Sequence, residues 1–187
     1  VSVAGNHSLD KGRTLLGLEL VKPLIIKQPK YFMFENVTGL LTKKFSAFKN
    51  ELLNSWKEAG YNIYSQVLNT RDHGIPHSRN RVFFVGIRKD IDHPFTFPEK
   101  EPLTLTLKDI IANSSFRTIP PFLFRNYGPY KRLDRLKSIS DDYFHTLTTN
   151  HSHWNQYILN ENRDQCRLLT KYEIFRLQGF HDDEIVL

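Results

Sequence analysis

Residues 31–37 read Tyr31-Phe32-Met33-Phe34-Glu35-Asn36-Val37. The four apolar residues at the start predict a short strand that is buried on both faces, and the run ends abruptly at Glu35 and Asn36. In an open α/β sheet, ligands gather beyond the carboxyl ends of the strands, which is where this carboxylate is expected. Glu35 is therefore a candidate for donating a proton or holding a ring nitrogen. A cap or a salt bridge at the strand end is the simpler alternative.

Helices are predicted on both sides of this strand. Apolar residues recur at helical spacing over residues 45–59, and Gly60 ends that helix. Upstream, leucines recur every four residues over residues 13–28, and Pro23 should kink or end the helix there. The expected apolar stripe consists of Leu16, Leu20 and Leu24.

Two further strands follow. Residues 61–68 and 82–87 are rich in β-branched and aromatic residues. Because a polar loop over residues 69–81, and no helix, separates them, we expect the two strands to pair antiparallel. The order strand, helix, strand predicts an α/β domain with a largely parallel sheet.

The rest of the chain is less regular. Three prolines within residues 92–102 indicate a domain boundary, and residues 104–112 predict a short helix. Residues 113–150 show no sustained period. At residues 170–173, Thr-Lys-Tyr-Glu is a capping box that opens a helix, which Gly179 ends.

The composition is that of a globular protein. The chain has 187 residues, with 40% hydrophobic and 25% charged residues and a formal net charge of +6. The single cysteine, Cys166, excludes an internal disulfide framework and a cysteine-rich zinc module, which favours a reducing compartment. No apolar run approaches the roughly 18 residues of a membrane span, and no secretion leader is readable. Neither membrane insertion nor secretion is expected.

Basic and aromatic residues are interleaved over residues 113–154. Cations that hold phosphate beside flat rings that stack on bases are typical of a nucleic-acid surface. The alternative is a small domain whose aromatic residues form its core and whose charges are solvated. The basic residues are Arg117, Arg125, Lys131, Arg132, Arg135 and Lys137.

Residues 74–81 form a second polar motif, Gly-Ile-Pro-His-Ser-Arg-Asn-Arg. A Gly-Pro turn leads toward a strand, and Arg79 and Arg81 are two residues apart. On an extended chain this spacing places both guanidinium groups on one side, where they can address phosphate and base together. Solvated arginines at a loop end are the alternative.

Together, these motifs strongly resemble the cytosine-5 DNA methyltransferases. In that family a Glu-Asn-Val signature ends one strand, like residues 35–37, and a Gln-x-Arg-x-Arg signature opens a later one, like residues 77–81. Residues 2–15 look like the stretch after the family's Pro-Cys-Gln, and residues 167–183 look like its late Arg-x-Leu-Thr and Arg-Leu-Gln-Gly-Phe block. The resemblance implies an incomplete S-adenosylmethionine-dependent methyltransferase sheet, of Rossmann-like α/β type, with a second, small recognition domain.

The resemblance also implies a reaction. A methyl group passes from S-adenosylmethionine to carbon 5 of a cytosine that is flipped out of the DNA duplex, after a cysteine thiolate adds to carbon 6. On this template Glu35 would hold ring nitrogen 3 and supply its proton. Arg81, with Arg79, would bind the ring oxygen and the neighbouring phosphate. These three are the expected catalytic residues.

Further substrate contacts follow from the same resemblance. Ser2 would contact the flipped nucleotide through its backbone, and Asn36 and Val37 would shape the base pocket. Residues 113–154 fall where the family has its target recognition domain. The candidate DNA contacts in the segment that closes this domain are Thr148 and Thr149.

Three parts are expected on this basis. Residues 1–102 would be the middle and C-terminal part of the catalytic domain, and residues 103–165 the small target recognition domain. Residues 166–187 would be a return segment whose late-motif helix packs on the catalytic domain.

The chain departs from the family pattern in several places. His77 stands where the family usually has Gln, and His181 replaces a common Pro. The nucleophilic cysteine and the cofactor motifs are absent, so S-adenosylmethionine is implied but its binding residues are unknown. Cys166 lies far along the chain from Glu35 and is not expected to replace the nucleophile. The chain is expected to be a fragment that is inactive alone.

The expected partner is double-stranded DNA, together with the missing N-terminal part or a complementary subunit. A restriction-modification role and a location in the cytoplasm or nucleoid, or in the nucleus of a eukaryote, would follow. The alternatives are a tRNA cytosine-5 methyltransferase, a non-catalytic DNA-binding remnant, and a subunit of a split enzyme. The tRNA branch carries a Cys-Phe-Thr triplet that this chain lacks. No metal is expected, since the closest histidine pair, His151 and His153, has no third ligand.

Overall fold

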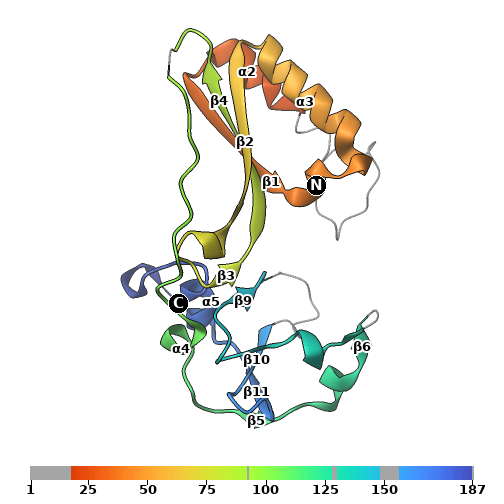
Figure 1. Cartoon of the computed structure of the whole chain (residues 1–187), viewed down its shortest axis with the longest axis vertical. Coiled ribbons are helices and arrows are strands. Elements are labelled where there is room, and N and C mark those ends of the chain that lie inside the picture. The colour runs from red at the N-terminus through yellow and green to blue at the C-terminus, as the bar shows by residue number, and fades with distance from the viewer. Residues whose placement is uncertain (1–17, 92, 128–129, 148–155, 187) are drawn as a thin grey trace. The chain divides into compact units, whose positions relative to one another are not determined.

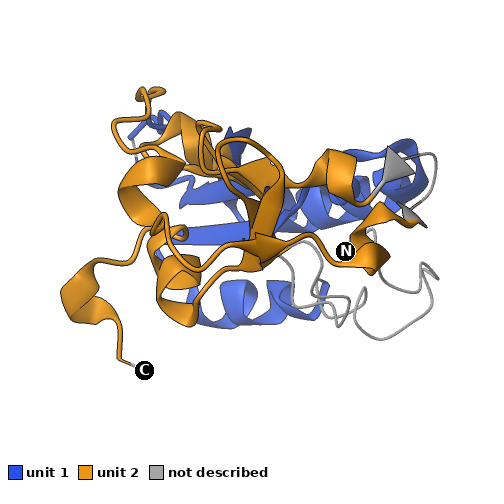
Figure 2. Cartoon of the chain, turned by 90° about the horizontal axis from the view of Figure 1, so that it is seen from below, with its two compact units in different colours: residues 1–68, 80–98 blue, residues 69–79, 99–187 orange. Residues whose placement is uncertain are grey.

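The computed structural model describes residues 18–91, 93–127, 130–147 and 156–186. The chain forms two compact units, coloured separately in Figure 2. Unit 1 consists of residues 1–68 and 80–98, and unit 2 consists of residues 69–79 and 99–187. The chain therefore crosses from one unit to the other three times.

Unit 1 contains a three-stranded sheet in the order β1-β4-β2 (Figure 1). The strands are β1 (Tyr31–Val37), β2 (Tyr61–Asn69) and β4 (Asn80–Arg88). β1 pairs antiparallel with β4, and β4 is also a hydrogen-bonded neighbour of β2, as the short loop between them predicted. The prediction of a largely parallel sheet is wrong for these strands, because β4 lies between the two strands that the helix connects.

β1 is buried on one face only. Phe32 and Phe34 pack on Trp56 with ring centroids 5.3 and 5.2 Å apart. Tyr31 and Met33, which alternate with them, are 55% and 69% exposed. The predicted burial on both faces is therefore wrong. β1 is an outer strand of the described sheet, and the described helical core covers a single face.

The long helix of unit 1 agrees with its apolar period. After the turns η1 (Thr38–Leu41) and η2 (Lys43–Phe45), α3 (Ser46–Glu58) buries Phe48, Leu52 and Trp56. Gly60 follows in the left-handed region, with φ +97°. A residue without Cβ adopts this conformation without strain, so glycine ends the helix here.

The predicted helix is interrupted just before Pro23, as expected: residues 18 and 19 are helical, Leu20 is a turn, and a new helix begins at Val21. This helix, α2 (Val21–Lys27), begins two residues before Pro23, which places the proline in the first turn. There its missing N–H is not needed for an intrahelical bond, and its fixed φ suits the helix. The predicted stripe fails at Leu20, which is 52% exposed, whereas Leu24 is buried.

Unit 2 is built from short elements. Its larger sheet has the order β5-β11-β10-β8, and β3 and β9 form a separate parallel pair. Because most strands here have only two to four residues, no sequence period develops, as residues 113–150 indicated. In chain order the elements are η3 (Thr70–Asp72), β3 (His77–Ser78), α4 (Leu107–Ile110), β5 (Arg117–Thr118), η4 (Pro121–Phe124), β6 (Asn126–Tyr127), β7 (Tyr130–Lys131), η5 (Leu133–Arg135), β8 (Lys137–Ser138), β9 (Phe144–His145), β10 (Tyr157–Leu159), β11 (Gln165–Leu168), α5 (Lys171–Arg176) and η7 (Asp182–Glu184).

Both predicted helices of unit 2 are confirmed. α4 is capped by Thr106, and α5 by Thr170 in the capping box that the sequence indicated. Buried apolar residues of α4 join residues of β9 and β10 in one core cluster. Within the described residues, no helix is both long and apolar enough to cross a bilayer.

Candidate active site

Glu35 and Arg81 form an ion pair in unit 1. In the β1–β4 register Glu35 is opposite Phe83 and Val37 is opposite Arg81, so the two charged residues are diagonal neighbours on one face. Arg81 Nε lies 2.7 Å from Glu35 Oε1. The carboxylate side chain is 44% exposed, whereas the arginine side chain is only 17% exposed. The sheet thus holds the guanidinium, and the guanidinium orients an accessible carboxylate.

The end of β1 is ordered by its own side chains. The backbone N–H of Val37 donates a hydrogen bond to Asn36 Oδ1 at 2.9 Å. Val37 then leads directly into the turn η1. Glu35, Asn36 and Val37 therefore lie at the carboxyl end of a strand, as the sequence predicted.

This arrangement can bind a polar ring. A carboxylate that is fixed on one oxygen and accessible to solvent can accept a hydrogen bond from a ring N–H or donate a proton to a ring nitrogen. The neighbouring guanidinium supplies positive charge for an oxygen or a phosphate. The salt bridge that was the simpler alternative for Glu35 is therefore present. The same salt bridge also orients the exposed carboxylate so that it can contact a polar ring.

The second motif is divided between the two units. Arg81 belongs to β4 of unit 1, whereas Arg79 precedes that strand and belongs to unit 2. The backbone N–H of Arg79 donates to the Thr70 hydroxyl at 3.2 Å, and the Arg79 carbonyl accepts from the Thr70 N–H. The alignment of both guanidinium groups on one side of the chain stays a prediction. Thr70, which sequence reasoning missed, fixes the backbone at Arg79.

His77 connects this motif to a segment about 70 residues later. β3 pairs in parallel with β9, and Phe144 N–H donates to the Pro76 carbonyl at 2.8 Å. The His77 ring is buried, and its Nε2 accepts a hydrogen bond from Leu147 N–H at 3.0 Å. At Nε2 the His77 ring is therefore a hydrogen-bond acceptor.

Replacement of His77 by Phe is expected to lower the free energy of unfolding of the chain by about 1–3 kcal/mol, because Leu147 N–H loses its acceptor. His77→Gln keeps an acceptor oxygen and should restore most of the loss. Urea unfolding, followed by circular dichroism, measures both variants. Equal stability of the Phe and Gln variants would show that this hydrogen bond contributes nothing.

Three of the predicted contact residues, Ser2, Thr148 and Thr149, lie outside the described residues. The described segment that leads to Thr148 ends beside the second motif, where the Thr146 hydroxyl donates to the Ser78 carbonyl at 2.6 Å. The predicted recognition segment and the Gly-Ile-Pro-His-Ser segment therefore share one unit.

The aromatic residues of the predicted recognition segment serve different purposes. Phe144 is fully buried in the core, and Phe122 packs against Tyr157 with ring centroids 5.7 Å apart. Phe124, in contrast, is 50% exposed. Part of the aromatic pattern therefore reflects core formation, which was the alternative to a nucleic-acid surface.

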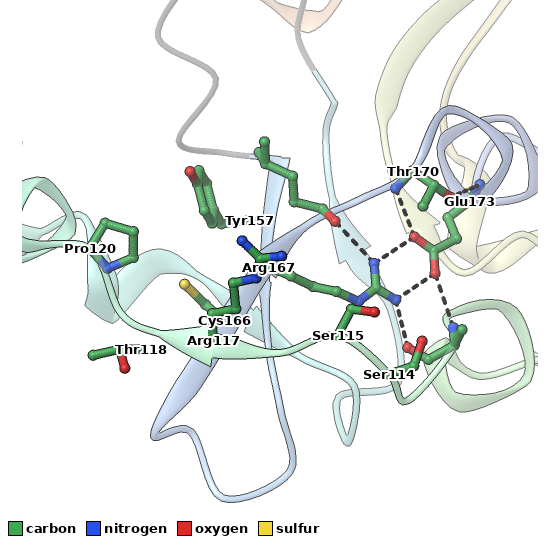
Figure 3. Close-up of a pocket in the computed structure, with 12 residues that line it drawn as sticks. Ser114, Ser115, Arg117, Thr118, Pro120, Tyr157, Cys166, Arg167, Thr170 and Glu173 are labelled. Atoms are coloured by element: carbon green, nitrogen blue, oxygen red, sulfur yellow. Dashed lines mark hydrogen bonds and ion pairs between the residues drawn. The ribbon is translucent and has the colours of Figure 1, made fainter.

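Cys166 lies in β11, where it is 2% exposed and borders a pocket of unit 2 (Figure 3). Burial raises the pKa of its thiol, which keeps it in the unreactive neutral form. This environment is that of a structural cysteine, not of a nucleophile. Among the described residues, no three or more His, Cys, Asp or Glu side chains gather into a possible metal site.

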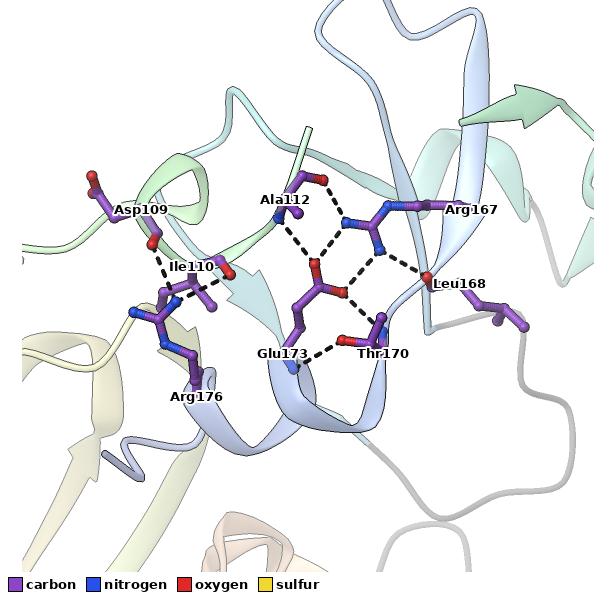
Figure 4. A network of polar contacts seen from close by, with 8 residues as sticks. All are labelled: Asp109, Ile110, Ala112, Arg167, Leu168, Thr170, Glu173 and Arg176. Atoms are coloured by element: carbon purple, nitrogen blue, oxygen red, sulfur yellow. Dashed lines mark hydrogen bonds and ion pairs between the residues drawn. The ribbon is translucent and has the colours of Figure 1, made fainter. Parts of the chain in front are cut away.

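The late block is held by a buried ion pair (Figure 4). Arg167 Nη2 and Nη1 lie 2.6 and 2.8 Å from the two carboxylate oxygens of Glu173. The backbone N–H groups of Ala112 and Thr170 also donate to this carboxylate, and Arg167 Nη2 donates to the Ala112 carbonyl. The capping box signalled Glu173, but no sequence pattern indicates its arginine partner or Ala112.

A family model described as C-5 cytosine-specific DNA methylase matches residues 1–126, about two thirds of the chain. The chain belongs to this family. The matched range contains both motifs described above, from Glu35 to Arg81. The resemblance that the sequence indicated is confirmed.

Curated relatives in this family are longer than the chain. M.HgiCII, a Type II methyltransferase of Herpetosiphon aurantiacus, is 38% identical over 122 residues, which are 64% of this chain and 28% of that protein. M.BspRI of Lysinibacillus sphaericus is 28% identical over 201 residues, 97% of this chain and 47% of that protein. The chain thus spans less than half the length of these relatives.

Solved structures confirm the predicted fold. A DNMT2 variant of Spodoptera frugiperda superposes with a TM-score of 0.72 at 16% identity, covering 100% of this chain and 67% of that one. The methyltransferase EhMeth of Entamoeba histolytica also gives 0.72, at 18% identity, covering 95% and 60%. The chain therefore has the α/β fold of the S-adenosylmethionine-dependent methyltransferases.

Proposed function

We propose that this chain is part of a cytosine-5 DNA methyltransferase, which transfers a methyl group to carbon 5 of a flipped cytosine. The chain would supply residues that bind the flipped base. The observation that carries the proposal is the ion pair between Glu35 and Arg81 at the carboxyl end of β1. Family membership and the Type II methyltransferase relatives support the reaction class.

The residues have distinct proposed roles. Glu35 holds ring nitrogen 3 of the cytosine and supplies a proton to it, which stabilises the charge that develops when carbon 6 is attacked. Arg81 orients that carboxylate and, with Arg79, binds the ring oxygen and the adjacent phosphate. Asn36 and Val37 shape the base pocket.

The remaining proposed contacts are in the two flanking segments. Ser2 contacts the flipped nucleotide through its backbone, while Thr148 and Thr149 contact DNA at the end of the recognition domain. The hydrogen bonds that join residues 144–147 to residues 76–78 support a position of that segment next to the second motif.

We propose a division into a catalytic part (1–102), a target recognition domain (103–165) and a return segment (166–187). The change of unit between residues 98 and 99 supports the first boundary. β11 and α5 belong to the same unit as residues 103–165, and the packing of the late-motif helix on the catalytic part stays a prediction.

S-adenosylmethionine is the proposed methyl donor of the whole enzyme, but the described residues do not form a site for it. One described pocket of unit 1 lies against α2 and α3, and another lies beside Tyr61 and Lys89. Glu35 borders neither pocket, and the glycine-rich motif expected for the cofactor is absent from the sequence. The chain alone is therefore proposed to be inactive, with the nucleophile and donor site supplied by the missing part or a complementary subunit.

Double-stranded DNA is the proposed substrate, in the cytoplasm or nucleoid of a prokaryote and within a restriction-modification system. The Type II methyltransferases among the relatives support this choice over tRNA. A DNA-binding remnant without catalysis is less well supported, because Glu35 and Arg81 retain an orienting contact.

Expression of the source gene in a host without cytosine-5 methylation tests the function. We expect 5-methylcytosine at one short sequence in the host DNA, detected by bisulfite sequencing, and none in tRNA. The purified 187-residue chain should transfer no methyl group in a single-turnover assay. Modified tRNA with unmodified DNA, or no modification by a folded gene product, would contradict the proposal.

A further inference from the structure

Unit 2 contains a pocket of about 460 Å³ that the proposed reaction does not use (Figure 3). It is lined by β5 and β11, by the chain before β5, and by Tyr157 of β10. Two arginines, Arg117 and Arg167, border it together with four serine and threonine side chains. These hydroxyl side chains are Ser114, Ser115, Thr118 and Thr170.

One polar atom in this pocket lacks a partner. The side chain of Arg167 is only 10% exposed, and its terminal nitrogens are occupied by Glu173 and by backbone carbonyls. Its Nε–H is buried and donates to no acceptor among the described residues. A buried donor without an acceptor is unfavourable, so the pocket offers a binding position for an anionic or carbonyl oxygen.

Arg117 adds a second cation to the pocket. It lies opposite Cys166 in the β5–β11 register, and no described residue forms an ion pair or hydrogen bond with its guanidinium. Arg117 and Arg167 together carry two positive charges, against the single carboxylate of Glu173. The lining therefore keeps one excess positive charge.

The other titratable side chains of the lining do not cancel that charge. Burial raises the pKa of the Tyr157 phenol and of the Cys166 thiol. Both groups are therefore neutral near pH 7, and neither repels an anion. The phenol ring also gives the pocket one flat apolar wall.

We propose that this pocket binds a phosphate group. Arg117 would provide the planar pair of donors that matches two phosphate oxygens, and Arg167 Nε–H would bind a third oxygen. The hydroxyl groups of Ser114, Ser115 and Thr118 can donate to the remaining lone pairs. The volume leaves room for an attached nucleoside beside Tyr157. The phosphate is that of a free mononucleotide or of a nucleic-acid backbone, and the site does not depend on methyl transfer.

Arginine side-chain NMR of the full chain tests this proposal. Titration of inorganic phosphate, and separately of a cytidine 5′-monophosphate probe, should shift the Nε–H signals of Arg117 and Arg167. Arg117→Gln should weaken binding at least about tenfold, the loss expected when a charge-assisted hydrogen-bond pair is removed. The matched control is Arg163→Gln, an exposed arginine that lies outside this pocket and pairs with Asp141; this variant should bind both probes as the unmodified chain does.

Two further comparisons complete the test. If a backbone phosphate is the ligand, Arg117→Gln should lower the salt dependence of duplex binding by the equivalent of about one phosphate contact. Arg163→Gln in the same titration serves as the reference. If a free nucleotide is the ligand, the cytidine monophosphate should bind more tightly than phosphate alone. Absence of any shift, equal shifts with acetate, or equal loss in both variants would overturn the phosphate site. These readouts need no methylation, so their failure leaves the proposed function untouched.

Discussion

Replacement of Glu35 by Gln should lower methyl transfer by the source gene product by roughly 10²–10⁴-fold, the usual contribution of a positioned acid or base. The amide has the same size as the carboxylate and can still accept a hydrogen bond from Arg81. It cannot supply a proton to a ring nitrogen. The loss should therefore appear in the rate of transfer under single-turnover conditions, with duplex binding nearly unchanged.

The control for this experiment is Glu51→Gln on the exposed surface of α3. Both variants should unfold within about 1 kcal/mol of the unmodified protein, because the Glu35 ion pair is partly exposed to solvent. If Glu35→Gln retained full activity, the carboxylate would be only a salt-bridge partner of Arg81. The assignment of an acid role would then be wrong.

Replacement of Glu173 by Gln should destabilise the chain by about 3–5 kcal/mol, since it leaves the Arg167 guanidinium buried without its counter-charge. The amide also replaces one of the two acceptor oxygens that serve Arg167, Ala112 and Thr170 by a donor. Thermal unfolding of the 187-residue chain measures the loss. Glu161→Gln is the matched control, because its ion pair with Lys108 is half exposed and should contribute less than about 1 kcal/mol.

This destabilisation should depend on pH. Burial tends to raise the pKa of Glu173, but the hydrogen bonds from Arg167, Thr170 and Ala112 outweigh it and hold the pKa below the ordinary carboxyl value. The pKa of Glu173 is therefore lower in the folded chain than in the unfolded chain. Its stabilising contribution is complete above the pKa of the unfolded state and is lost as the pH falls through the pKa of the folded state. The difference between the two proteins should therefore be constant near neutral pH and shrink in acid. A difference that grows in acid would contradict the assignment.

Local sequence patterns predicted the helices and strands whose apolar residues recur at regular spacing. The face of α3 formed by Phe48, Leu52 and Trp56 follows from spacing alone, as does the glycine that ends it. The exposure of Met33 does not follow, because an apolar run does not show how many faces of a strand its neighbours cover. The place of Pro23 depended on where α2 begins, and the sequence contains no capping residue that marks this.

Sequence motifs indicated which residues form the candidate site, but they did not indicate its geometry. Glu35, Asn36 and Val37 were identified from a motif, and the structure adds the diagonal pairing that brings Arg81 to Glu35. The contact between His77 and Leu147 joins residues 70 positions apart, and such pairs leave no local period. Long-range contacts of this kind need a fold before they can be seen.

The chain passes between the two units three times, and this limits which segments can be exchanged between related proteins. Residues 69–79 are encoded between two strands of unit 1, yet residues 76–78 among them are hydrogen-bonded to residues 144–147 of unit 2. A gene exchange that replaced only residues from 99 onward would separate this short segment from its native partner. A hybrid chain that exchanges residues from 99 onward should therefore also exchange residues 69–79, so that β3 and β9 keep matched partners.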